Sequence, residues 1–177
     1  MVSVKYIIGS IYSFIVSIRN YLYKYKVLKI NKFNVPIVSV GNITVGGSCK
    51  TPMVQYLAQI LKSNQWRPCI ISRGYKRKNN HLKLVSINNN SPKLDDIGDE
   101  AYMLSKHLPE IPIIVADKKS IAINYAIHNL NINIIIIDDG FQSLYINRDI
   151  DIVMINSLLE EKDYRMFPLG KAREKIN

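Results

Sequence analysis

A glycine-rich stretch, VGNITVGGSCKTP at residues 40–52, constrains the fold more than any other part of this sequence. It follows the apolar run Val35–Val40 and precedes a segment with helical spacing at Thr51–Ser63, so it predicts a strand, a loop and a helix. Backbone N–H groups and the dipole at the start of such a helix favour a bound phosphate. The position of Pro52 agrees with this prediction, because proline is tolerated in the first turn of a helix.

The stretch matches the general phosphate-loop pattern only in part. That pattern has a glycine, four residues and then Gly-Lys-Ser/Thr. Here Lys50 and Thr51 are present, but Thr44 and Cys49 occupy the two glycine positions. Taken alone, the stretch is better explained by a glycine-rich turn that ends in Lys-Thr by chance.

Further apolar runs alternate with helical patterns along the chain. Strands are expected at Pro68–Ser72, Ile111–Ala116, Asn133–Ile137 and Asp151–Ile155, an added strand at His81–Ile87, helices at Asp99–His107 and Ser120–Asn129, and a turn-rich loop at Asn88–Asp96. Apolar strands without alternation are buried on both faces, as in a parallel sheet covered by helices. The order therefore predicts a doubly wound α/β fold, whose ligand lies beyond the carboxyl ends of the strands. The loops that begin at Gly41, Arg73 and Asp138 should converge there.

Acidic residues follow two of these elements. IIIIDDGFQ, residues 134–142, delivers two adjacent carboxylates from a buried strand, where an acid facing a phosphate loop can hold Mg²⁺; the alternative is a simple Asp-Gly turn. Asp99 in Gly-Asp-Glu is either part of a helix cap or a carboxylate base for a hydroxyl group. Arg73 and Arg77 either clamp phosphate or are solvated.

The first 34 residues carry six of the ten excess positive charges and no acid. Tyr6–Ile18 is mostly apolar, but it is shorter than the roughly 20 residues that cross a bilayer, and no cleavage site of a signal peptide follows it. An amphipathic helix with a basic, tyrosine-rich end suits an anionic membrane surface, to which residues 1–28 would bind. The alternative is a helix packed on its own domain. No nucleic-acid-binding signature accompanies the charge, and Cys49 and Cys69 have no metal-type or disulfide spacing, which favours a reducing cytosol.

Five motifs occur in a family's order: VGNITVGGSCKTP, SRGYKRK, GDEA, IIIIDDGFQ and FPLGKARE. Over residues 1 to about 174 the sequence resembles the lipid A tetraacyldisaccharide 4'-kinases. The resemblance implies a P-loop NTPase-like, doubly wound, mostly parallel sheet with an N-terminal amphipathic helix. It also implies Mg²⁺-ATP as cofactor and transfer of the γ-phosphate to the 4'-hydroxyl of a tetraacyldisaccharide 1-phosphate in lipid A biosynthesis. The location it implies is peripheral, on the cytoplasmic face of a Gram-negative inner membrane, where the N-terminal helix serves as the membrane and lipid-substrate element.

The resemblance also assigns roles by matching position. ATP-binding residues would be Thr44, Val45, Gly46, Gly47, Ser48, Cys49, Lys50 and Thr51. Catalytic residues would be Asp99, as the base toward the sugar hydroxyl, and Lys50, on the β- and γ-phosphates. Metal ligands would be Thr51, Asp138, Asp139 and Glu174, and phosphate or substrate contacts would be Arg73, Tyr75, Gln142 and Arg173.

Several positions depart from the family pattern: Cys49 and Lys76 replace glycines, Ser143 replaces a histidine, and Lys171-Ala172 interrupts a Gly-Pro-Leu-Arg run. A left-handed conformation at Cys49 would cost roughly 1–2 kcal/mol. We expect residues 1–34 to form the membrane-associating helix and basic stretch, and residues 35–177 to form the kinase core. The family continues into a second domain, so we expect its C-terminal half to be absent here or separately encoded, and half a cleft to transfer phosphate poorly. The alternatives are a non-catalytic membrane-surface remnant of that kinase and an unrelated P-loop ATPase.

Overall fold

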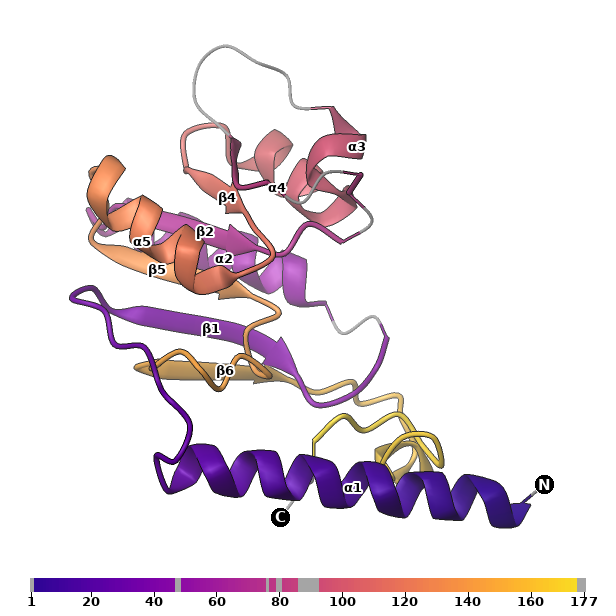
Figure 1. Ribbon diagram of the computed structural model, residues 1–177. Helices are drawn as coiled ribbons and strands as arrows, with labels where there is room; N and C mark the ends of the chain where they lie inside the picture. The colour runs from indigo at the N-terminus through magenta and orange to yellow at the C-terminus, as the bar shows by residue number, and fades with distance from the viewer. Residues whose placement is uncertain (1, 47–48, 76, 79–80, 86–92, 175–177) are drawn as a thin grey trace.

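The computed structural model describes residues 2–46, 49–75, 77–78, 81–85 and 93–174. Its centre is a six-stranded sheet in the order β3-β4-β2-β5-β1-β6 (Figure 1). The strands are β1 (Ile37–Asn42), β2 (Pro68–Ser72), β3 (Lys83–Val85), β4 (Ile113–Val115), β5 (Ile134–Asp138) and β6 (Ile150–Met154). All neighbouring pairs are parallel except β3 with β4. The predicted α/β fold with a mostly parallel sheet is confirmed.

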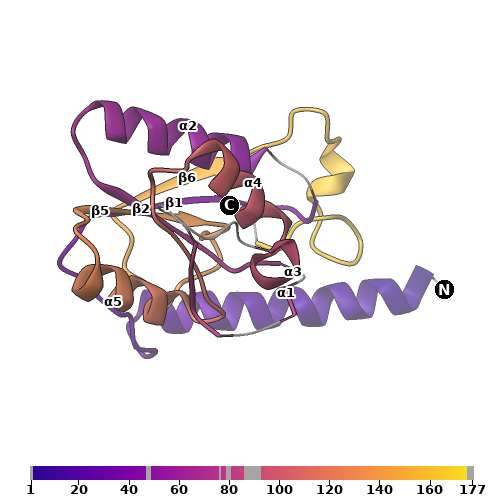
Figure 2. The same ribbon diagram turned by 90° about the horizontal axis from the view of Figure 1, so that it is seen from above.

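Helices cover both faces of the sheet. The helices α2 (Lys50–Ser63) and α4 (Asp99–His107) lie on one face, and α5 (Lys119–Asn129) lies on the other (Figure 2). Alternate residues of β5 enter two separate cores, because Ile136 packs with the α2 and α4 side while Ile135 and Ile137 pack with the α5 side. This two-sided burial is why the strand reads as an unbroken run of isoleucine.

The carboxyl end of the sheet is closely packed where β1 meets the turn after β5. Val40 is in register with Asp138, which places the glycine-rich loop beside the two acids. A Cβ on Gly41 would lie 2.5 Å from the Cβ of Phe141, so only glycine lets this turn close on β1. The carboxyl end of β1 and the acidic carboxyl end of β5 therefore lie side by side.

Helix α1 (Val2–Lys24) runs beside the β6 end of the sheet (Figure 1). It packs on residues 167–174, called the C-terminal segment below. Val16 is buried, and the ring of Tyr12 meets Phe167 edge-on at 6.1 Å between centroids. Large apolar side chains along one side of α1, here called the apolar stripe, are exposed: Ile7, Ile8, Ile11, Phe14, Ile15, Ile18 and Tyr25. The helix therefore contacts its own chain through the other side. Within the described part of the chain, no helix is long and apolar enough to span a bilayer.

The turn-rich loop predicted for Asn88–Asp96 is wrong at its end, because Leu94–Ile97 forms the short helix α3. Its acids pair with lysines that precede it, Lys78 with Asp95 and Lys83 with Asp96 at 2.5 Å, and a local pattern does not register such contacts. The middle of the predicted loop, residues 88–92, lies outside the described residues, as do the last two residues of the strand predicted at His81–Ile87. Glu161–Tyr164 forms a short 3-10 helix that was not predicted.

Candidate functional site

The first half of the glycine-rich loop is fixed by the C-terminal segment. Thr44 is buried and forms an isolated bridge with Ala172. The Val45 amide donates to the Lys171 carbonyl at 2.7 Å, and the Arg173 amide donates to the Ile43 carbonyl at 2.7 Å. Thr44 is thus part of a small backbone ladder with residues 171–173. Two predicted ATP-binding residues, Gly47 and Ser48, lie outside the described residues.

Cys49 ends the loop and precedes the first residue of α2. Its φ of 56° and ψ of 28° place it in the left-handed region, and its side chain is exposed and makes no cap hydrogen bond. Cys49 therefore adopts the conformation that favours glycine, at a cost of roughly 1–2 kcal/mol.

Asp139 lies between two cations that come from different parts of the chain. One carboxylate oxygen is 3.5 Å from Lys50 Nζ and the other is 3.6 Å from Arg173 Nη1. Asp139 also has a positive φ of 48°, so the turn after β5 is tight. Asp139 and the residues beside it, 138–140, are called the acidic turn below. The two ion pairs join the glycine-rich loop, the acidic turn and the C-terminal segment in one charged cluster.

Asp138, the last residue of β5, is 1% exposed. Both of its carboxylate oxygens are buried, and neither accepts a hydrogen bond from the described residues. Burial, followed by the nearby carboxylates of Glu100 and Asp139, raises the pKa of Asp138 from 3.8 to about 7. A buried, unpartnered pair of oxygens is the environment that a cation completes.

Lys119, at the start of α5, stabilises the acidic turn through hydrogen bonds to its backbone. Its ammonium donates to the Asp138 carbonyl at 2.9 Å and also to the Asp139 carbonyl, and it lies 3.4 Å from the Ser143 hydroxyl. Only 5% of Lys119 is exposed, and this burial lowers its pKa from 10.5 to about 8. Arg148 adds hydrogen bonds to the carbonyls of Gly140 and Phe141, both at 3.3 Å.

Sequence reasoning did not identify Lys119, Arg148 or Glu100 as parts of the site. Lys119 follows the end of β4, so the convergence of strand ends could have found it. Arg148 lies between β5 and β6, and no motif there marks it. Glu100 stands next to the predicted base, and its effect on Asp138 depends on distance across the fold.

A cavity of about 320 Å³ opens beside the acidic turn. It is lined by Arg73, Asp117, Lys119, Asp139, Gln142, Ser143, Tyr145 and Arg173. Three predicted phosphate or substrate contacts, Arg73, Gln142 and Arg173, are therefore brought together. Gln142 is oriented by a 2.8 Å hydrogen bond to the Asn42 carbonyl.

Arg77 has neither of the two roles considered from the sequence. Its guanidinium lies 2.6 Å from Asp117 Oδ1, and its side chain is 2% exposed, so it is neither solvated nor placed in the cavity. It also donates to the His81 carbonyl at 2.7 Å. Arg77 instead fixes the segment between β2 and β3 against the residues that follow β4.

The remaining predicted residues lie at the edge of this region. Asp99 is exposed at the first position of α4, where no side chain caps the helix. Tyr75 is exposed. Its backbone lies so close to Gly98 that a Cβ on Gly98 would be 2.3 Å from the Tyr75 carbonyl oxygen. Thr51 is half-buried in the first turn of α2. Glu174 is buried and faces α1, where Arg19 and Asn20 contact its two carboxylate oxygens.

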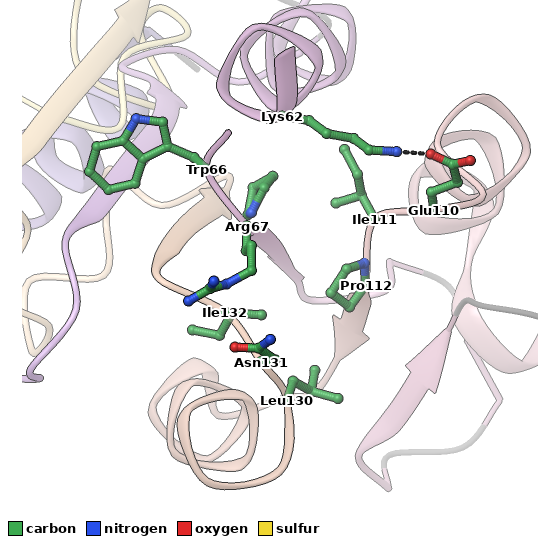
Figure 3. Close-up of a pocket in the computed structure, with 10 residues that line it drawn as sticks. Lys62, Trp66, Arg67, Glu110, Ile111, Pro112, Leu130, Asn131 and Ile132 are labelled. Carbon is green, nitrogen blue, oxygen red and sulfur yellow. Dashed lines mark ion pairs between the residues drawn. The ribbon is translucent and has the colours of Figure 1, made fainter. Parts of the chain in front are cut away.

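A second cavity, of about 290 Å³, lies at the opposite end of the strands, where β2, β4 and β5 begin (Figure 3). Lys62 pairs with Glu110 on one side, and Leu130, Asn131 and Ile132 line another. None of the predicted site residues that the structure describes lines it. The charged cluster at the carboxyl end is therefore the candidate site.

This site can place an anionic ligand between the loop and the acidic turn, and the unpartnered oxygens of Asp138 can complete the shell of a cation. Among the described residues, no group of three or more His, Cys, Asp or Glu side chains could hold a metal ion alone. A cation here would need ligands from a hydroxyl group and from a bound phosphate as well.

Comparison with known proteins extends this assignment. The family model for Tetraacyldisaccharide-1-P 4'-kinase matches residues 3–177. A tetraacyldisaccharide 4'-kinase of Aquifex aeolicus is 40% identical over 169 residues, covering 94% of this chain and 52% of the relative. That of Desulfotalea psychrophila is 35% identical, covering 97% and 50%.

A crystal structure of LpxK from Aquifex aeolicus, described as an "apo" form in complex with ATP, matches with a TM-score of 0.86 and 39% identity. The match covers 98% of this chain and 54% of that one. The chain thus spans about half the length of the curated relatives it matches.

Proposed function

This chain belongs to the tetraacyldisaccharide-1-P 4'-kinase family, and on that premise we propose that it forms the nucleotide-binding half of such a kinase. The reaction would transfer the γ-phosphate of ATP to the 4'-hydroxyl of a tetraacyldisaccharide 1-phosphate, a lipid A precursor. The observation that carries the proposal is Asp138, whose buried carboxylate has no hydrogen-bond partner among the described residues and stands in register with β1. The second half of the family's proteins would complete the cleft, on this polypeptide or on a separately encoded one.

The phosphates of ATP would bind at the loop Thr44–Thr51, as the sequence predicts. The N-terminus of α2 directs backbone N–H groups toward the loop. Lys50, now paired with Asp139 at 3.5 Å, would contact the outer phosphates. Arg173 lies against the same carboxylate and would stabilise charge on the transferring group.

Asp138, Asp139 and the Thr51 hydroxyl would hold Mg²⁺. When bound, Mg²⁺ neutralises charge on the phosphate oxygens. The two acids fit this role because Asp138 has no partner of its own and the oxygens of Asp139 are only loosely paired. Glu174, the fourth predicted ligand, is held by Arg19 and Asn20 and would support the site from α1 rather than contact the ion.

Asp99 would accept the proton of the sugar hydroxyl, since it is an exposed carboxylate at the first position of α4, next to Glu100, whose charge acts on Asp138. The cavity beside the acidic turn would take the acceptor, with Arg73, Gln142 and Arg173 as contacts, while Tyr75, the fourth predicted contact, is not among the residues that line it. Its three cationic side chains suit a phosphorylated sugar. Lys119 and Arg148 would keep the acidic turn in place during transfer.

Residues 1–28 would attach the protein to an anionic membrane surface, on the cytoplasmic face of the inner membrane of a Gram-negative cell. The exposed apolar stripe of α1, together with its basic residues, supports this proposal. The acceptor is itself a lipid, so a peripheral helix near the site would deliver the protein to its substrate.

The test of this function is transfer of labelled γ-phosphate to a tetraacyldisaccharide 1-phosphate in detergent micelles, with and without the second half of a relative added in trans. We expect transfer with the added half, and its loss in Asp99→Asn while ATP still binds. ATP binding without transfer under both conditions would favour the alternative of a non-catalytic remnant of the kinase.

A further inference from the structure

We propose that Arg19 and Asn20 of α1 are positioning residues for the nucleotide site, acting through Glu174. This inference rests on the proposed function, because it gives α1 a role in ordering the same site. The connection runs from α1 through residues 171–174 to the phosphate loop and to Asp139.

The first step is the contact between α1 and Glu174. Arg19 donates to one carboxylate oxygen, and Asn20 Nδ2 donates to the other at 3.2 Å. Arg19 also donates to the Asn20 side-chain oxygen at 3.1 Å, so the three side chains form one network. Glu174 is 5% exposed, and a buried carboxylate is stable only when it is paired.

The second step is the residue that precedes Glu174 in the chain. Arg173 reaches Asp139 with its guanidinium at 3.6 Å. Its amide donates to the Ile43 carbonyl at 2.7 Å, and its carbonyl accepts from the Tyr12 hydroxyl of α1 at 3.4 Å. Arg173 therefore touches α1, the loop after β1 and the acidic turn at once.

The third step is the ladder along the loop. The Val45 amide donates to the Lys171 carbonyl, and Thr44 is bridged to Ala172. A displacement of Glu174 moves residues 171–173, and with them the partners of Ile43, Thr44 and Val45. Residues 171–173 thus support both the glycine-rich loop and the Arg173 guanidinium beside Asp139, and Arg19 and Asn20 hold these residues in place through Glu174.

The outer side of α1 gives this network a consequence. Its apolar side chains are exposed while Arg19 and Asn20 face inward, so a surface that binds α1 fixes the two positioning residues as well. Coupling of this kind is reciprocal. Binding that orders α1 favours the loop conformation that binds nucleotide, and a bound nucleotide favours the packing of α1 on Glu174.

The test uses the full chain with Arg19→Gln, Arg19→Lys and the matched control Lys24→Gln, which removes a charge from an exposed position on the same helix. Hydrogen exchange without nucleotide is followed at the Val45 and Arg173 amides and, as a reference, at Ile136 in the central strand β5. We expect Arg19→Gln to speed exchange about tenfold at the first two amides and not at Ile136. Arg19→Lys should restore much of the protection, and Lys24→Gln should change nothing.

Affinity for Mg²⁺-ATP is measured on the same proteins, and Arg19→Gln should weaken it about tenfold. Unchanged exchange at Val45 and Arg173 in Arg19→Gln would overturn the inference, as would an equal acceleration at Ile136, which would mark a general loss of stability. A wild-type chain that binds no Mg²⁺-ATP would instead contradict the proposed function, while the exchange measurement still decides the coupling.

Discussion

The ammonium of Lys50 lies 3.5 Å from a carboxylate oxygen of Asp139, so the first residue of α2 and the turn after β5 are joined by an ion pair. Asp139 is 38% exposed, and pairs of this kind contribute little to stability. Their proximity matters more than their energy. It shows that a loop with an unusual cysteine and a strand end with two acids form one site.

The conformation of Cys49 leads to the first prediction. Cys49→Gly should raise the free energy of unfolding by about 1 kcal/mol, because glycine relieves the left-handed strain but loses more chain entropy on folding. Urea unfolding measures the difference. The matched variant Cys49→Ala keeps the strain, so equal stability of Cys49→Gly and Cys49→Ala would contradict the interpretation.

The raised pKa of Asp138 leads to the second prediction. Folding raises that pKa from 3.8 to about 7, so the ionised carboxylate costs stability. This cost is absent below about pH 4, grows as the pH rises, and is complete above about pH 7. Asp138→Asn should therefore be more stable than wild type by about 1–2 kcal/mol at pH 8 without Mg²⁺, and nearly equal to it at pH 4.

Thermal unfolding across this pH range checks the second prediction. The control is Glu161→Gln, which removes an exposed carboxylate and should leave the profile unchanged. An Asp138→Asn protein whose stability follows the wild-type pH dependence would show that Asp138 is not the titrating group.

The buried ammonium of Lys119 supports the acidic turn. Lys119→Met would leave the carbonyls of Asp138 and Asp139 without their charged donor, and should lower the free energy of unfolding by about 2–3 kcal/mol. The neighbouring Lys118 is exposed, so Lys118→Met is the matched control and should cost less than about 0.5 kcal/mol. Equal effects in chemical denaturation would refute the supporting role of Lys119.

The exposed stripe of α1 leads to a prediction about membrane binding. Phe14 is 66% exposed, and Phe14→Glu should weaken association with vesicles that contain phosphatidylglycerol at least about tenfold, because burying a phenylalanine contributes about 1.5–3 kcal/mol. Ser10→Glu adds the same charge at the margin of the stripe without removing an apolar side chain, and should have a smaller effect. Co-sedimentation measures both, and equal losses would argue against insertion of the stripe.

Much of the architecture could be predicted from local pattern. The unbroken isoleucines of β5 indicate a strand buried on both sides, and the loop before Lys50 indicates a strand followed by a helix. The same order placed Arg73, Gln142 and Asp139 at one edge, where they line one cavity. These features depend on residues close in sequence or on a general property of parallel sheets.

The rest depends on contacts that no local pattern encodes. Lys119 acts on the acidic turn through backbone carbonyls, which any residue types would supply. Helix α3 forms where acids pair with Lys78 and Lys83 from an earlier segment. Glu174 could be matched to a motif, but its contact with Arg19 joins opposite ends of the chain.

The central claim, a Mg²⁺-dependent ATP site at the carboxyl end of the sheet, is tested most directly by calorimetric titration of the purified chain with ATP. We expect a single site with a dissociation constant below about 1 mM in the presence of Mg²⁺, and at least about tenfold weaker binding without Mg²⁺ or in the Asp138→Asn protein. Absence of binding at millimolar Mg²⁺-ATP in both the wild-type and the Cys49→Gly proteins would contradict the account.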